Sequence, residues 1–292
     1  MSHLEPIKLS MKDQVESLRM KAGHEAASHG FSSLYIWKEE MKLGICLEKD
    51  FFSVSYGLRG EHAWFFPCGD RKAVREWISC QIKEDELCFY YMRREDALFL
   101  EQEFPGCFEI RLCENDSEYL YDRKQQEKLQ GRKFSGQRNH INRVLHDHRL
   151  RWERLCDENM DTAMEICGLW ERDRERTGGI RDTEAVRNLL GHRRELSVEG
   201  ILVYVDEEPY AVAAGYPLSY STFDLALAKQ KSFLTGLSVY VKHQLFLSLP
   251  EQYEWINAEE DLGIPGLRTM KRQMRPVGQM EMYTGRKKQD EA

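Results

Sequence analysis

The sequence has little of what would restrict it to a specialised class of protein. Of its 292 residues only 8 are proline and 20 are glycine, and 41% are hydrophobic, which excludes a disordered or fibrous chain. It lacks a run of about 18 to 20 apolar residues, the length of a membrane-spanning helix. Residues 1–13 lack the apolar stretch of a signal peptide. We therefore expect a folded protein of the cytoplasm.

An excess of positive charge is also missing. The chain has 42 lysines and arginines against 49 acidic residues, a net charge of −7, so binding of nucleic acid or membrane over the whole surface is not expected. Any anion site must be local. The 8 cysteines are spread out, without a C-x-x-C pair or a zinc-site spacing. We expect reduced thiols that mostly pack as small apolar side chains, and no metal.

Hydrophobic periodicity predicts a mixed order of strands and helices in the first half of the chain. Apolar residues three and four apart predict helices, whereas short aromatic and β-branched runs between turn residues predict strands. The expected helices are 11–27, 71–82 and 96–104, and the expected strands are 33–37, 43–48, 51–56, 62–67, 87–92 and 107–112.

The second half repeats this order of elements. The expected helices are 157–172, 183–196, 236–249 and 263–274, and the expected strands are 200–206, 209–217, 222–229, 253–257 and 280–284. Strands followed by helix, strand, helix and strand resemble the GNAT acyltransferase fold. The resemblance implies an α/β protein with mixed sheets, built from two tandem GNAT-like domains over residues 1–115 and 116–292. One large α+β domain is the alternative.

A loop with a central glycine follows the strand 222–229. In the GNAT fold this loop binds the pyrophosphate of coenzyme A, because helix N-terminal N–H groups favour negative charge. Of the consensus positions only Gly236 fits, and Phe233 and Ser238 depart from it. The candidate cofactor-binding residues are Lys229, Lys231, Gly236, Leu237 and Ser238. The alternative is that Gly236 only allows a tight turn from strand to helix.

Positive charge is concentrated in one segment. Between Arg123 and Arg154 there are ten lysines and arginines against three acidic residues. Guanidinium groups bind phosphate through two hydrogen bonds, and asparagine binds sugar or amide groups. The substrate-binding candidates, in a turn and on the helix after it, are Arg132, Lys133, Arg138, Asn139 and Arg143. The alternative is a solvated basic helix.

Three carboxylates stand between a predicted buried strand and a helix. Glu259 and Glu260 are candidates to deprotonate or recognise an amino group at the open end of the sheet. Arg268 and Lys271, three residues apart on one helical face, are candidates to hold an anion. We assign Asn257, Asp261, Arg268 and Lys271 to substrate binding. The alternative is structural: acidic residues favour a helix N-terminus, and Asp261 can cap it.

Three segments carry a resemblance to a known family. The chain resembles the DUF2156 family, which is similar to the C-terminal domain of phosphatidylglycerol lysyltransferase. The resemblance lies in residues 118–121 with 131–143, in the strand 225–229 with Gly236, and in residues 256–276. The resemblance covers residues 117–286 and implies two GNAT-like domains with an aminoacyl-tRNA-dependent activity. The family commonly has arginine, an acidic residue and Ser-Tyr where Ala258, Ala228, Gln273 and Met274 stand. Because these polar groups are missing, the lysyl-lipid activity itself is not implied.

These features predict an acyl or aminoacyl transferase that uses direct attack in a ternary complex. The donor would be acyl-CoA, with coenzyme A as its carrier, or aminoacyl-tRNA, and the acceptor a small amine or hydroxyl compound. Glu259 or Glu260 would act as base, and Tyr240 or Tyr283 would protonate the leaving group. The absence of a recognisable Ser-His-Asp pattern suits this route. The alternative is a non-catalytic GNAT-like module that binds a nucleotide, coenzyme A or tRNA.

Overall fold

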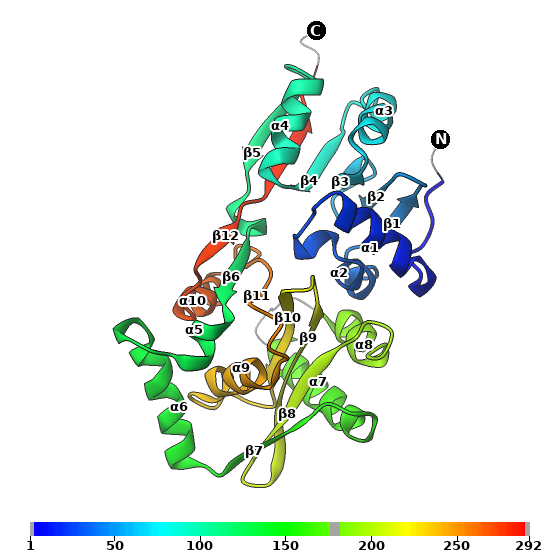
Figure 1. Ribbon diagram of the computed structural model, residues 1–292. Coiled ribbons are helices and arrows are strands. Elements are labelled where there is room, and N and C mark those ends of the chain that lie inside the picture. The colour runs from blue at the N-terminus through cyan, green and yellow to red at the C-terminus, as the bar shows by residue number, and fades with distance from the viewer. Residues whose placement is uncertain (1–2, 176–181, 290–292) are drawn as a thin grey trace. The chain divides into compact units, whose positions relative to one another are not determined.

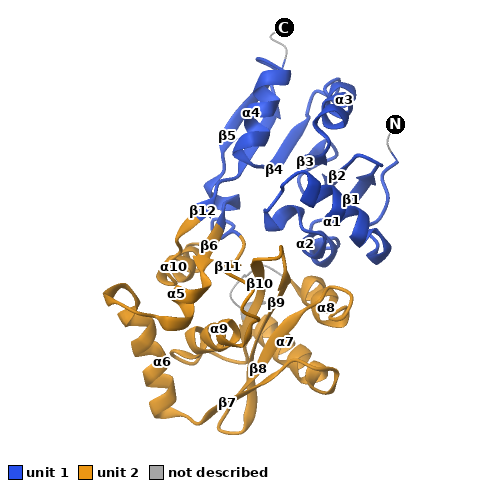
Figure 2. Cartoon of the chain, in the orientation of Figure 1, with its two compact units in different colours: residues 1–118, 260–263, 279–292 blue, residues 119–259, 264–278 orange. Residues whose placement is uncertain are grey.

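A computed structural model of the protein describes the chain apart from residues 1–2, 176–181 and 290–292 (Figure 1). The chain forms two compact units (Figure 2). Unit 1 comprises residues 1–118, 260–263 and 279–292, and unit 2 comprises residues 119–259 and 264–278. None of the helices in the described ranges is long and apolar enough to cross a membrane. All eight cysteines are free, as expected.

Unit 1 contains a six-stranded mixed sheet in the order β1-β2-β3-β4-β13-β5. Its strands are β1 (Leu43–Leu47), β2 (Phe51–Tyr56), β3 (Ala63–Gly69), β4 (Cys88–Met92), β5 (Phe108–Leu112) and β13 (Tyr283–Lys287). Its helices are α1 (Lys12–Lys21), α2 (Phe31–Trp37), α3 (Arg71–Gln81) and α4 (Arg94–Glu103), with short 3₁₀ turns η1 (Leu9–Met11), η2 (Ala27–His29) and η3 (Glu114–Asp116).

The alternation of side chains along β3 places helices on both faces of this sheet. Phe65 lies 5.9 Å from the ring of His29 in η2, whereas its neighbour Phe66 lies 6.3 Å from Phe99 in α4. Successive residues of a strand point to opposite faces, so α4 and η2 cover different sides.

Two sequence expectations in this region are wrong. Residues 33–37 belong to helix α2 rather than to a strand, and the helix expected over 11–27 ends at Lys21. The carboxylate of Glu118 accepts hydrogen bonds from the N–H groups of Ala27 and Ser28 at 2.9 and 3.1 Å. These two long-range bonds hold the 3₁₀ turn η2 just before Gly30. Gly30 is the N-cap of α2 and does not end the first helix.

Unit 2 is built on the second, seven-stranded sheet, in the order β12-β6-β11-β10-β9-β8-β7. The strands are β6 (Glu118–Asp122), β7 (Leu150–Arg154), β8 (Glu199–Val205), β9 (Glu208–Pro217), β10 (Thr222–Gln230), β11 (Trp255–Asn257) and β12 (Gly278–Met280). The helices are α5 (Arg123–Lys128), α6 (Ser135–Asp147), α7 (Met160–Glu175), α8 (Thr183–Gly191), α9 (Leu237–Ser248) and α10 (Pro265–Gln273), with 3₁₀ turns η4 (Arg132–Phe134) and η5 (Asp157–Asn159).

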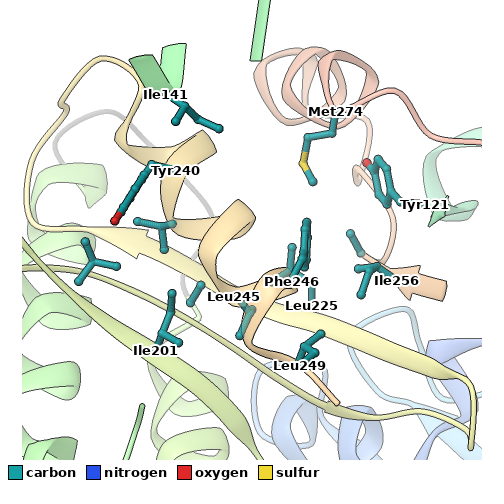
Figure 3. Packing of buried hydrophobic residues seen from close by; sticks show 14 of the residues in the cluster. Tyr121, Ile141, Ile201, Leu225, Tyr240, Leu245, Phe246, Leu249, Ile256 and Met274 are labelled. Carbon is teal, nitrogen blue, oxygen red and sulfur yellow. The ribbon is translucent and has the colours of Figure 1, made fainter. Parts of the chain in front are cut away.

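Helix α9 forms the core of unit 2 against one face of the sheet (Figure 3). Its Leu245 and Phe246 pack among Ile201, Leu225 and Ile256 of the strands, all within one buried apolar cluster. Burial of side chains of this size stabilises a fold by about 1.5–3 kcal/mol each relative to exposure. Helix α7 packs against β9 and β10.

Both units contain the same supersecondary arrangement. In unit 1 β4 runs parallel to β3 with α3 between them in sequence, and in unit 2 β11 runs parallel to β10 with α9 between them. The sequence order suggested that the last strand belongs with the second half of the chain. Instead β13 pairs antiparallel with β4 and β5 of the first sheet. Strand pairing is a long-range contact, so chain order alone does not assign a strand to its sheet.

A β-bulge interrupts the pairing of β9 with β10. In the β9–β10 pair Asp224 lies opposite Tyr216 and Leu227 opposite Ala214, so Leu225 and Ala226 face the single residue Gly215. A bulge bends the strand that carries the extra residue. A Cβ atom on Gly215 would lie 1.7 Å from the carbonyl oxygen of Asp224, so this position requires glycine.

We predict that Gly215→Ala lowers the free energy of unfolding by about 1–3 kcal/mol, because the added methyl group forces the bulge to shift. Urea denaturation followed by circular dichroism measures this change. Gly168→Ala in α7 is the control: a Cβ there meets nothing within 4 Å, and alanine favours a helix by up to about 1 kcal/mol. Equal effects of the two substitutions would contradict the bulge argument.

Two neighbouring histidines are buried in unit 1. The rings of His24 and His29 lie 3.9 Å apart, and His29 Nε2 lies 2.8 Å from the carbonyl oxygen of Phe66. Burial lowers the pKa of His29 to about 4 and holds the pKa of His24 well below its ordinary value. Both rings are therefore neutral in the folded protein near neutral pH.

The neutral state of His29 makes folding sensitive to acid. Below pH 6.5 the unfolded histidine takes up a proton that the folded one refuses until about pH 4, so stability falls through this window. We predict that the difference in unfolding free energy between wild type and His29→Gln shrinks by about 3 kcal/mol as the pH falls from about 7 to about 4. Urea titrations at a series of pH values test this. A difference that is independent of pH would refute it.

Candidate functional site

The two parallel strands of unit 2 stay paired over only three residues. Thr222–Asp224 of β10 lie in register with Trp255–Asn257 of β11, where β11 ends, whereas the ladder between β10 and β9 continues to Gln230. The bulge at Leu225 and Ala226 begins directly after the last paired residue. From there on, the edge of β10 that faced β11 has no neighbouring strand among the described residues. We call this opening the β10–β11 splay.

Polar side chains lie in a row beside the splay. Asp224 is the register partner of both Asn257 in β11 and Tyr216 in β9, and register partners point to the same face of a sheet. Their neighbours Phe223 and Ile256 belong to the core under α9, so this row lies on the opposite face. All three polar residues are fully buried. Burial of polar groups is costly, so a buried row of this kind marks a specialised part of the sheet.

Lys229 stands on the same face, further along β10. Its Nζ lies 2.6 Å from Oδ1 of Asp182 and 4.1 Å from the centre of the Trp170 ring in α7. The lysine is 6% exposed, so its charge is balanced inside the protein rather than presented to solvent. Lys231, the other lysine of the expected coenzyme A site, lies in the loop, 3.4 Å from Glu208.

Hydrogen bonds hold the backbone of the acidic turn after β11. Asn257 Oδ1 accepts from the N–H of Glu259 at 2.8 Å, and Tyr119 exchanges two backbone bonds of 3.0 Å with Ala258 and Glu259. The Nζ of Lys271, in α10, donates to the carbonyl oxygen of Ala258. Glu259 has a φ of +56°, a left-handed conformation that costs a non-glycine residue about 1–2 kcal/mol. Such strain is concentrated at functional sites.

The rest of the turn belongs to unit 1. Glu260 is half-buried, and Asp261 is buried with Oδ1 accepting from the N–H of Gly263 at 2.9 Å. The alternative that Asp261 caps helix α10 is wrong. Ile264 occupies the N-cap of α10, and no side chain caps that helix. Asp261 closes a local turn instead, three residues earlier.

The glycine before α9 has a packing role. Gly236 has a φ of +90°, and a Cβ there would lie 2.2 Å from the carbonyl oxygen of His140 in α6. Close contact between α6 and α9 therefore explains this glycine. Leu237 is buried in the core, and Ser238 is half-buried. A pyrophosphate site at this helix stays a prediction.

The two candidate acids lie in different units. Tyr240 is buried in the α9 core of unit 2, and burial raises its pKa (Figure 3). Tyr283 is in β13 of unit 1, where its hydroxyl donates to Glu281 at 3.0 Å and this bond raises its pKa. Their proposed roles are not tested by these positions.

The basic residues of the segment 123–154 divide into structural and exposed groups. Arg138 donates to the carbonyl oxygens of Leu129 and Gly131, at 2.9 Å for the second, and so closes the turn before α6. Lys133 donates to Gln125 at 2.7 Å. Arg132 and Asn139 are exposed, and Arg143 is exposed with Asp147 at 3.9 Å. In the 255–271 segment, Arg268 is half-buried and Lys271 is 6% exposed.

Of the buried row, sequence reasoning identified Asn257 and missed Asp224 and Tyr216. A carboxylate at position 224 interrupts the apolar run 223–228, and that interruption is the signal that would have identified Asp224. Tyr216, Asp182 and Trp170 carry no comparable signal, because only strand register and helix packing bring them to this face.

Comparison with known proteins agrees with this architecture. The family model described as "Phosphatidylglycerol lysyltransferase, C-terminal" matches residues 20–284. No curated protein sequence was found to match the chain.

Solved structures resemble the chain over almost its whole length. A conserved protein of unknown function from Bacteroides thetaiotaomicron is 24% identical, with a TM-score of 0.89, covering 99% of this chain and 100% of that one. L-PGS from Bacillus licheniformis is 14% identical, with a TM-score of 0.66 and coverages of 99% and 94%. A tandem GNAT protein from the clavulanic acid biosynthesis pathway is 9% identical, with a TM-score of 0.53 and coverages of 97% and 98%. The mixed α/β GNAT-like fold expected from the sequence is confirmed.

We predict that Glu259→Gly leaves the protein at least as stable as the wild type and raises the free energy of unfolding by up to about 1 kcal/mol, because glycine relieves the left-handed strain. Glu260→Gly is the matched control, since its φ is not positive. Glu260→Gly should be less stable than the wild type by about 0.5–1 kcal/mol, because glycine gives the unfolded chain extra backbone freedom. Urea denaturation of both variants decides the point, and a destabilised Glu259→Gly would show that the turn is not strained.

Proposed function

The chain belongs to the family of the phosphatidylglycerol lysyltransferase C-terminal domain, and we propose that it is an aminoacyl or acyl transferase that works at the β10–β11 splay. The observation that carries this proposal is the coincidence of four features. A bulge lies where the pair of parallel strands opens, a buried polar row borders the opening, a braced acidic turn follows β11, and Glu259 is strained there.

The acyl carbonyl would lie at the free edge of β10. Backbone N–H groups between Leu225 and Lys229 that face the splay have no partner strand there in the described part of the chain. Preorganised N–H donors of this kind stabilise the negative charge that develops on a carbonyl oxygen under attack. The bulge thus bends β10 and lies where backbone N–H donors are left open to the acyl carbonyl.

The charge of the polar row favours an aminoacyl group over a plain acyl group. Asp224 is a carboxylate and Asn257 an amide, side by side in adjacent strands. A buried carboxylate attracts an ammonium group, which an aminoacyl donor carries and an acetyl donor does not. The family description names a lysyltransferase, whose acyl group bears such a charge.

Transfer needs one proton acceptor and one proton donor. The nitrogen or oxygen of the acceptor attacks the acyl carbon, a C–N or C–O bond forms, and the ester or thioester bond to the donor breaks. The proton of the acceptor passes to Glu259, and the leaving hydroxyl or thiol takes up a proton from Tyr240 or from water. Glu259 suits the role of base because its turn is held by Asn257 and Lys271.

Of the two donors, aminoacyl-tRNA is the better supported. The contact with His140 already explains Gly236, so this glycine is no separate indication of a pyrophosphate loop. Arg132, Arg143 and Arg149 are exposed in the basic segment of the same unit and are available to phosphates. Acyl-CoA bound at Leu237 and Ser238 is the other candidate.

The test is an acceptor-dependent assay with two donors on one preparation. We expect purified protein to release lysine from lysyl-tRNA only when an amine or phosphatidylglycerol acceptor is added, and acetyl-CoA to be turned over more slowly or not at all. Donor binding without turnover would refute the transferase proposal and support the binding module. Faster turnover of acetyl-CoA would refute the choice of donor.

A variant tests the role of the polar row. We predict that Asp224→Asn lowers kcat/KM for the aminoacyl donor by about ten- to a thousandfold, since a charged hydrogen bond contributes roughly 1.5–3 kcal/mol and burial strengthens it. Asp206→Asn, in the turn between β8 and β9, is the control and should change kcat/KM less than twofold. An equal loss of kcat/KM with acetyl-CoA as donor would show that Asp224 does not recognise the ammonium group.

A further inference from the structure

Lys242 is a buried cation without an anionic partner. It lies in α9, is 3% exposed, and its Nζ donates to the thioether sulfur of Met270 at 3.3 Å. No carboxylate in the described part of the chain lies within ion-pair distance of it. Sulfur is a weak acceptor, and an ammonium group has three N–H donors to satisfy. Burial of an unpaired charge costs several kcal/mol, so this arrangement requires an explanation.

The charged neighbour of Lys242 has the same sign. Lys271 of α10 is 6% exposed and donates its Nζ to the carbonyl oxygen of Ala258. Burial and then the charge of Lys271 lower the pKa of Lys242 to about 8, so Lys242 is still mostly protonated at neutral pH. Two helices thus bring two ammonium groups together in the interior of one unit.

A small pocket adjoins Lys242, with a volume of about 10 Å³, which is space for one water-sized group. The other polar groups that line it already have main-chain partners. Gln126 donates to Met274, Gln137 donates to Gln273, and His243 lies 2.9 Å from the carbonyl oxygen of Glu127. Lys242 is therefore the lining residue whose donors lack oxygen acceptors.

We propose that this pocket binds one small monovalent anion, a single halide ion, beside Lys242. Such an anion accepts hydrogen bonds from the ammonium group of Lys242. Its negative charge offsets the electrostatic repulsion between Lys242 and Lys271. The volume admits one atom of this size and excludes a whole sulfate or phosphate. The proposal is independent of the transferase proposal, because it concerns the opposite face of the sheet from the polar row.

The test is a titration of the full-length protein, with no donor or acceptor present, at constant ionic strength. Protein labelled with ¹⁵N-lysine reports the Nζ signal of Lys242, and sodium chloride, sodium acetate and sodium sulfate are the probes. We expect a saturable shift with chloride, and none with acetate or sulfate, which are larger than one atom. Because no substrate is used, the result does not depend on whether the protein is a transferase.

Variants keep the test decisive. Lys242→Met removes the charge and leaves an apolar side chain of similar length beside Met270, so it should fold. Thermal denaturation should show that chloride stabilises the wild type with an apparent dissociation constant at least tenfold lower than in this variant. Lys124→Met, at an exposed lysine in the same unit, is the control and should behave as the wild type. Equal chloride responses of wild type and Lys242→Met, or the absence of a saturable shift, would overturn the proposal.

Discussion

The early end of the ladder between β10 and β11 is the constraint on which the rest of unit 2 depends. Three residues pair, and then Leu225 and Ala226 bulge opposite Gly215. Backbone N–H and C=O groups inside a sheet need hydrogen-bond partners. A strand edge that is left open in the middle of a sheet therefore costs free energy unless a ligand forms those hydrogen bonds. The open edge begins directly after Asp224 and Asn257, the last pair of the ladder.

The buried charges of unit 2 follow from this opening. Lys229 is balanced by Asp182 at 2.6 Å on one face of the sheet, and Lys271 braces the turn after β11 through Ala258. Each cation thus holds a segment that borders the splay. Buried ion pairs contribute little net stability, so their presence is better explained by the positions they impose than by the energy they add. Lys242 is the exception, because the protein supplies it with no anion within the described residues.

The two units share a way of completing their sheets. Each has a parallel pair joined through a helix, and beside that pair lies an antiparallel strand from a distant part of the chain: β13 next to β4, and β6 next to β11. The residues 118–121, which resemble a family motif, are explained in part by this arrangement. Tyr121 pairs with Ile256 in the sheet, and Glu118 holds the turn at Ala27.

The sequence by itself determined most of the elements, the fold class and the segments that border the site. Aromatic and β-branched runs predicted β1 to β5 and β8 to β11, because strand periodicity is a local property, and the turn at Glu259 was identified from its charges. Only the tertiary structure decided the rest. It placed 33–37 in helix α2, placed β13 in the first sheet, and brought His140 against Gly236. It also brought Asp224 beside Asn257, because strand register joins residues that are far apart in the chain and leaves no local pattern.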